Sequence, residues 1–314
     1  MIGAVDIGGT KLAVGLVDEW GKVLRKAETP TGADSRYSAG LQNIADMLGG
    51  MARSARTEIT GIGIGSTGPV DPVTGELGEV DFLPNWRHQN LVRDLTSAFG
   101  VKAALENDAD AGALGESRWG AGQGAARLIY ITLGTGIGGG ILLDGQLYRG
   151  VGGAHPELGH HVIDPSGPPC SCGTRGCWES LAAGPAMVSW AQGQTRAGDS
   201  YGTAKEICEL AFAGDELAAR AVERETRYLG LGIANLINLF TPDRIVLGGS
   251  LMRSASLFLD GIRRQISGAC RFVPWEKTEL ALASLGEDSN LIGAASVWHN
   301  RFGSRARPEV HCAE

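Results

Sequence analysis

The sequence predicts a mixed α/β protein, and two observations carry this prediction. First, short apolar runs rich in β-branched residues alternate along the chain with longer segments whose apolar residues recur at helical spacing. Second, one pattern starts at residue 2 and again at residue 127. It consists of a strand, a loop rich in glycine and threonine, a second strand, a turn and a third strand. Two such loops would suit two phosphate clamps that face each other across a cleft.

Composition limits the possible classes of protein. The chain has 314 residues, enough for one large or two medium domains, with 43% hydrophobic and 20% charged residues. Its net charge of −7 and the lack of a basic run argue against nucleic acid as a partner. No apolar stretch reaches the roughly 18–20 residues that span a membrane. We also expect no signal peptide, because residues 1–7 lead straight into a strand.

The first glycine loop follows the apolar run at residues 2–7, which contains Asp6. Adjacent glycines let backbone N–H groups and a threonine hydroxyl approach phosphate oxygens. Asp6 would then hold Mg²⁺ through water. A plain β-hairpin with a tight turn explains the same pattern, and the local sequence does not decide between them. The loop residues are Gly8, Gly9, Thr10 and Lys11.

Alternating helices and strands follow this first unit. Residues 36–55 and 91–99 have the apolar spacing of amphipathic helices, and residues 59–65 and 101–106 resemble strands. The segment from residue 109 to 120 is rich in alanine and predicts another helix.

Asp108 therefore lies where a strand ends and a helix begins. Asp is a preferred N-cap residue, and this is the simpler interpretation. The alternative is a general base, stabilised as a carboxylate by the helix N-terminus. Asn107 beside it could hydrogen-bond a polyol.

The second glycine loop, residues 134–140, contains a literal G-x-G-x-x-G. A dinucleotide-binding fold requires a helix next, whereas a strand, an Asp-Gly turn and another strand follow here. No GxxxxGK[ST] motif is present, so the chain is not a P-loop protein. The phosphate-binding interpretation assigns Gly134, Thr135 and Gly136 to this loop.

The last third of the chain predicts helices over residues 204–240 and 251–267, and a final helix over 290–299. Between them, residues 241–250 predict a strand that ends at Gly248 and Gly249. Two glycines here would let an adenine ring lie flat on the backbone, although an ordinary turn into a helix explains them equally well.

A cluster of metal-ligand type lies between residues 155 and 179. Three thiolates and one imidazole form a closed tetrahedral shell for zinc. Such a site is structural, because no open coordination position remains. Clustered cysteines also indicate a cytoplasmic metalloprotein rather than a disulfide framework. The predicted ligands are His160, Cys170, Cys172 and Cys177. Glu157 and Glu179 lie close to the cluster in sequence, whereas we leave His155 and His161 out of the ligand set.

These motifs, in this order, resemble the ROK family of bacterial sugar kinases and repressors. The matching segments are DIGGTK at 6–11, LENDADAGALGE at 105–116, LGTGIGGGI at 133–141, ELGH at 157–160, CSCGTRGCWE at 170–179 and IVLGG at 245–249. The resemblance implies an actin-like ATPase (ribonuclease H-like) fold with two α/β domains that flank a cleft. We expect a smaller domain of residues 1–107 plus about 290–314, and a larger domain of residues 108–289.

The resemblance also implies an ATP-dependent hexose kinase that phosphorylates the 6-hydroxyl of a sugar, with Mg²⁺ and structural Zn²⁺. Asp108 would be the catalytic base. Sugar hydroxyls would be bound by Asn107, Asp108, Glu157, His160 and Glu179. The nucleotide and its metal would be bound by Asp6, Gly8, Gly9, Thr10, Lys11, Gly134, Thr135, Gly136, Gly248 and Gly249. A homodimer through the larger domain is the expected assembly.

Substrate choice stays open at this point. Glucose is the first expectation, and N-acetylglucosamine, N-acetylmannosamine and fructose are alternatives. Phe82 stands where many family glucokinases have Asn, so neither Phe82 nor Asn85 receives a role. A non-catalytic sugar sensor is a different class, and the retained Asp108 and both glycine loops argue against it. Family repressors carry a DNA-binding segment ahead of the first loop, and we expect none before Asp6.

Overall fold

The computed structural model of the chain describes residues 1–32, 36–80, 83–195 and 201–303. It divides into two compact units. The first unit comprises Met1–Tyr130, Gly140–Pro156 and Ala283–Glu314, and the second comprises Ile131–Gly139 and Glu157–Leu282. Among the described residues, none of the helices is both long and apolar enough to cross a membrane.

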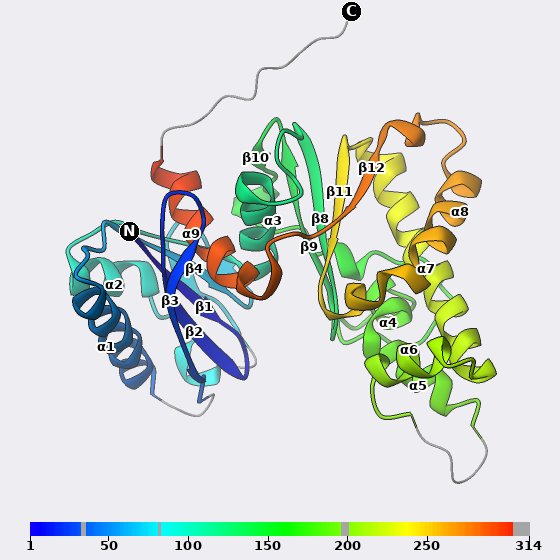
Figure 1. Cartoon of the computed structure of the whole chain (residues 1–314), viewed down its shortest axis with the longest axis horizontal. Helices are drawn as coiled ribbons and strands as arrows, with labels where there is room; N and C mark the ends of the chain where they lie inside the picture. The colour runs from blue at the N-terminus through cyan, green and yellow to red at the C-terminus, as the bar shows by residue number, and fades with distance from the viewer. Residues whose placement is uncertain (33–35, 81–82, 196–200, 304–314) are drawn as a thin grey trace, which may run out of the picture. The chain divides into compact units, whose positions relative to one another are not determined.

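The first unit is built on a five-stranded sheet of order β3-β2-β1-β4-β7 (Figure 1). β2 runs antiparallel to its neighbours β1 and β3, whereas β1, β4 and β7 are parallel. The strands are β1 (Ile2–Ile7), β2 (Lys11–Val17), β3 (Val23–Pro30), β4 (Gly61–Ser66) and β7 (Ala103–Asn107). A short separate hairpin is formed by β5 (Val70–Asp71) and β6 (Glu76–Leu77). The predicted strand–loop–strand–turn–strand beginning is confirmed.

Helices cover both faces of this sheet. Alternate residues of a strand point to opposite faces, so β1 serves two cores. Val5 and Ile7 pack with apolar residues of α1 (Tyr37–Ala55) and α2 (Leu91–Phe99). Ile2 and Ala4 pack with α9 (Ser289–Phe302), the final helix. Asp6 shares the second face, which explains its contact with α9 described below.

α3 (Asp108–Trp119) packs against α9 within the first unit. The two helices approach closely at Gly293, where an added Cβ would lie 2.8 Å from the backbone oxygen of Ala111. α3 is therefore part of the first unit. The sequence instead predicted a larger domain of residues 108–289, so the two divisions differ over residues 108–130, 140–156 and 283–289.

The second sheet has the order β10-β9-β8-β11-β12. Its strands are β8 (Arg127–Leu133), β9 (Ile137–Leu143), β10 (Gln146–Leu147), β11 (Arg244–Gly248) and β12 (Glu279–Leu282). The helices of the second unit are α4 (Trp178–Ala182), α5 (Gly184–Gln192), α6 (Ala204–Phe212), α7 (Glu216–Phe240) and α8 (Leu259–Ala269). The helix predicted over 251–267 is interrupted: a 3₁₀ segment, Ser250–Leu257, precedes α8, and the buried Phe258 lies between them.

Candidate active site

The residues predicted to form the site fall into two groups, one in each unit. The first unit contains Asp6, the first glycine loop, Asn107 and Asp108. The second unit contains the start of the second loop, the metal-ligand cluster, Glu157, Glu179 and the glycine pair after β11.

Asp6 is almost fully buried at the end of β1, with 6% of its surface exposed. Its Oδ2 accepts a hydrogen bond of 2.9 Å from Nδ2 of Asn290 in α9. Burial raises the pKa of Asp6, since the charged form loses hydration. The first loop turns directly from β1 into β2, with Thr10 exposed, and Lys11 pairs with Glu28 at 2.9 Å. The hairpin geometry is thus present, while the roles in phosphate and Mg²⁺ binding stay predictions.

Asn107, not Asp108, is the N-cap of α3. Its Oδ1 accepts a hydrogen bond of 2.9 Å from the backbone N–H of Ala109, and its side chain is nearly buried. Its Nδ2 makes no hydrogen bond with any residue of the described ranges, so a donor is free for a ligand. Asp108 is the first residue of the helix, and its Oδ1 accepts from the same N–H at 2.8 Å.

The carboxyl group of Asp108 is unusually basic. Solvent reaches the side chain, yet desolvation by the surrounding protein is the main cause that raises its pKa to about 6. The second cause is the negative charge of Asp6. His155 opposes both when it is protonated. A carboxylate with a pKa near the working pH suits general-base catalysis, because it is ionised and still accepts a proton readily.

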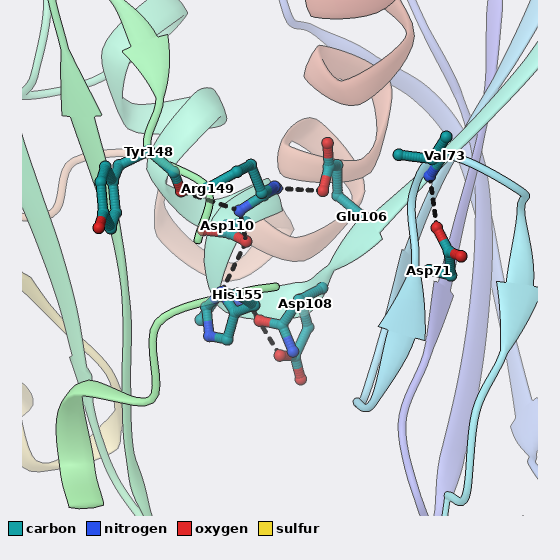
Figure 2. Close-up of polar contacts among 10 residues, drawn as sticks. Asp71, Val73, Glu106, Asp108, Asp110, Tyr148, Arg149 and His155 are labelled. Atoms are coloured by element: carbon teal, nitrogen blue, oxygen red, sulfur yellow. Dashed lines mark hydrogen bonds and ion pairs between the residues drawn. The ribbon is translucent and has the colours of Figure 1, made fainter. Parts of the chain in front are cut away.

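Sequence reasoning missed a charged network next to Asp108 (Figure 2). Arg149 contacts Glu106 at the end of β7 and Asp110 in the first turn of α3. Oδ2 of Asp110 also meets Nδ1 of His155 at 2.6 Å. Asp110 is completely buried, and an unpaired carboxylate there would be costly. Arg149 and His155 therefore stabilise the Asp110 carboxylate. The available signal was the run of acids at every second position of 106–110.

The second glycine loop is fixed by Glu179, in the first turn of α4. Oε2 of Glu179 accepts the backbone N–H of Ile137 at 2.8 Å. A Cβ at Gly136 would lie 2.5 Å from that oxygen, so a larger residue there would displace the Glu179 carboxylate from this position. Glu179 thus orders the loop through Oε2. Oε1, which makes no hydrogen bond within the described residues, stays available for the predicted contact with a sugar. Gly249 adopts a φ of +87°, and a Cβ there would overlap Leu133 of β8.

The four predicted metal ligands converge. Ligand atoms of His160, Cys170, Cys172 and Cys177 all lie within 4.8 Å of one another. Sγ of Cys170 is 3.4 Å from Nδ1 of His160, and Sγ of Cys172 is 3.5 Å from Sγ of Cys177. Zinc–sulfur bonds of about 2.3 Å in a tetrahedron require sulfur separations of this order. The donor set and spacing fit zinc, with Nδ1 of His160 turned to the cluster and Nε2 left over.

The other residues near the cluster separate into two kinds. Glu157 is exposed, and its carboxylate makes no hydrogen bond with any residue of the described ranges. His161 has a packing role: Nδ1 contacts the Leu158 carbonyl at 2.7 Å, and the ring lies against Trp178. This agrees with leaving His161 out of the ligand set. Asn85 is exposed in a 3₁₀ turn, and Phe82 lies outside the described residues.

Comparison with known proteins decides the family. The profile of the ROK family matches residues 2–301, nearly the whole chain. The chain belongs to the ROK family. The prediction from the motifs is therefore confirmed.

Related ROK proteins match along almost their full length. A glucokinase from Thermotoga maritima is 34% identical over 95% of this chain and 97% of its own. The crystal structure of a ROK hexokinase from Thermus thermophilus superposes with a TM-score of 0.82, at 35% identity over 96% of this chain and 98% of that one. A ROK glucokinase from Streptomyces griseus, in complex with glucose and AMPPNP, gives 0.77 at 33% identity over 95% and 99%. The predicted actin-like ATPase fold is thereby confirmed.

Proposed function

We propose that this chain is an ATP-dependent hexose kinase that phosphorylates the 6-hydroxyl of its sugar, with glucose as the preferred substrate. One observation carries the proposal: Asp108 stands at the head of α3 with a raised pKa, in a chain similar to glucokinases over nearly its whole length. Two of these relatives are named for glucose or bind it together with an ATP analogue.

In this mechanism Asp108 accepts the proton of the sugar hydroxyl as its oxygen attacks the terminal phosphorus of ATP. Nδ2 of Asn107 donates to a neighbouring hydroxyl, and Glu157 and Glu179 accept from others. Phosphoryl transfer depends mainly on positioning and on stabilising charge, so backbone N–H groups of both glycine loops hold phosphate oxygens. Asp6 would hold Mg²⁺ through water, and the ion would supply positive charge that offsets the charge of the phosphates.

Zinc in the proposed enzyme would be structural. His160, Cys170, Cys172 and Cys177 would hold it and leave no position for substrate, so the metal would tie together the loop from which Glu157 and Glu179 project. His160 would use Nδ1 for the metal and Nε2 for a sugar hydroxyl. A homodimer and a cytoplasmic location complete the proposal, and light scattering of the purified protein tests the dimer.

A sugar panel tests the function. ADP release is measured with ATP, Mg²⁺ and glucose, fructose, N-acetylglucosamine or N-acetylmannosamine. We expect the highest kcat/KM with glucose. Preference for another sugar of the panel would keep the kinase and replace its substrate. No turnover with any sugar, combined with sugar binding in calorimetry, would indicate the non-catalytic sensor. The Asp108→Asn protein, purified in parallel, controls for contaminating kinases.

A further inference from the structure

The second unit contains a groove of about 770 Å³ among α5, α7, α8 and the 3₁₀ segment Ser250–Leu257. None of the candidate site residues lines it. This volume lies within the usual range of small-molecule sites, roughly 300–1,000 Å³. Four arginines and two aromatic rings dominate its walls: Arg220, Arg224, Arg227, Arg264, Trp190 and Tyr228.

The charge of the groove opposes that of the chain. The protein has a net charge of −7, yet four guanidinium groups gather here against one lining acid, Glu223. In the described part of the chain, Arg220, Arg227 and Arg264 form no ion pair. Within the same residues, the one ion pair of Arg224 is a long contact of 3.8 Å with the carboxylate of Glu225.

Aromatic rings hold several of these guanidinium groups in place. Arg220 lies 5.8 Å from the centre of the Trp190 ring, and Arg224 lies 4.8 Å from that of Tyr228. Stacking of this kind leaves the N–H edges of a guanidinium free to donate, and a phosphate group accepts two parallel N–H bonds. Several guanidinium groups without ion pairs therefore favour a phosphate over a single carboxylate.

We propose that this groove is a binding site for a small phosphorylated molecule. It is also linked to the helix that presents Glu179. Nη1 of Arg224 donates to the Leu181 carbonyl at 3.0 Å, and Nε1 of Trp178 donates to the Tyr228 carbonyl at 3.0 Å. Leu181 and Trp178 both belong to α4, on either side of Glu179. A phosphate that engages Arg224 competes with the contact to Leu181 and thereby shifts sugar affinity, a consequence that rests on the proposed function.

Calorimetric titration with inorganic pyrophosphate tests the site. The protein is compared with an Arg220→Gln/Arg227→Gln variant and with a control, Arg271→Gln/Arg301→Gln, that loses the same charge from exposed positions outside the groove. We expect saturable binding by the protein and the control, and affinity at least tenfold weaker in the groove variant. The four substituted arginines, two in each variant, are all exposed, so both variants should fold. Circular dichroism checks this.

Three results would overturn the proposal. If pyrophosphate binds at the glycine loops instead, the groove variant will bind it with unchanged affinity. Binding that weakens equally in the control would reflect net charge alone. A change of molecular mass in light scattering, with pyrophosphate binding intact, would make the groove an interface between proteins. The affinity for glucose with and without pyrophosphate is measured separately, so failure of the proposed kinase function leaves the groove test valid.

Discussion

At the scale of single residues, the chemistry depends on how Asp108 is surrounded. Its pKa is raised by the charge of Asp6 and lowered by that of His155. Asn107 caps the helix. Oδ2 of Asp108 makes no hydrogen bond within the described residues, since Oδ1 accepts the N–H of Ala109. These surroundings give a base whose strength is set by burial and charge, and two predictions follow from them.

Replacing Asp108 by Asn should remove the base and retain the shape of the site. We expect kcat to fall by about 10²–10⁴-fold, while glucose affinity changes little. Steady-state kinetics and calorimetry measure the two quantities. Asp144→Asn, a matched change in the exposed turn between β9 and β10, should keep full activity. Near-normal turnover in Asp108→Asn would exclude Asp108 as the base.

The pH profile of kcat/KM should report the raised pKa of Asp108. Only the ionised form accepts a proton, so activity should fall as pH drops through about 6. Protonated His155 lowers the pKa of Asp108, so His155→Gln should move the inflection to higher pH. Rates measured from pH 4.5 to 8.5 test both. An inflection at the ordinary aspartate value, or one that is unmoved in His155→Gln, would contradict this account.

At the scale of elements, the first unit depends on close backbone contact between the sheet and α9. Gly61 and Gly63 of β4 leave room for this helix. A Cβ at Gly63 would lie 1.9 Å from the carbonyl oxygen of Ala294, inside any possible contact distance. α9 contributes Asn290 to Asp6, so this packing also positions the buried carboxylate at the end of β1.

Gly63→Ala should therefore destabilise the protein. Overpacking against a rigid backbone atom costs about 1–3 kcal/mol, or more if the helix is displaced. Gly50→Ala is the matched control, because no atom lies within 4 Å of the added Cβ in the interior of α1. Helix propensity predicts a gain of about 0.5–1 kcal/mol there. Urea unfolding of both variants gives the free energies, and equal stability of the two would refute the contact.

At the scale of the whole molecule, the chain forms two compact units, and the predicted metal ligands all lie in the second. Few strands or helices surround the cluster, which lies in a loop rich in glycine and proline between η3 (Leu158–His160) and α4. The free energy of metal binding would therefore contribute directly to the folding of this loop.

Removal of the zinc proposed for this cluster should consequently affect the second unit alone. We expect a chelator to increase amide hydrogen exchange over residues 157–182, with residues 1–107 unchanged, and to raise the KM for glucose. Cys172→Ser should show the same exchange without chelator and no further response to it. Cys208→Ala, which removes a buried thiol outside the cluster, should keep the chelator response. An unchanged exchange pattern in zinc-free protein would refute the structural role.

The sequence by itself determined most strands and helices, both glycine loops and the metal-ligand cluster, whereas α4, α5 and the short β5–β6 hairpin were not predicted. These features are local. Strand and helix periods, adjacent glycines and ligand spacing can all be recognised within about 25 residues of sequence. The interruption of the helix predicted over residues 251–267 was missed, because apolar spacing continues through the 3₁₀ segment before Phe258.

Only the tertiary structure decided which groups surround Asp108. Asp110 meets His155 from 45 residues away, and Asp6 meets Asn290 from 284 residues away. Glu179 holds the N–H of Ile137 across 42 residues. The pKa of a carboxyl group depends on burial and on charges brought near by folding, and no local pattern encodes those distances. The sequence thus predicts Asp108 as the base, and the surroundings that folding brings together raise the pKa of its carboxyl group.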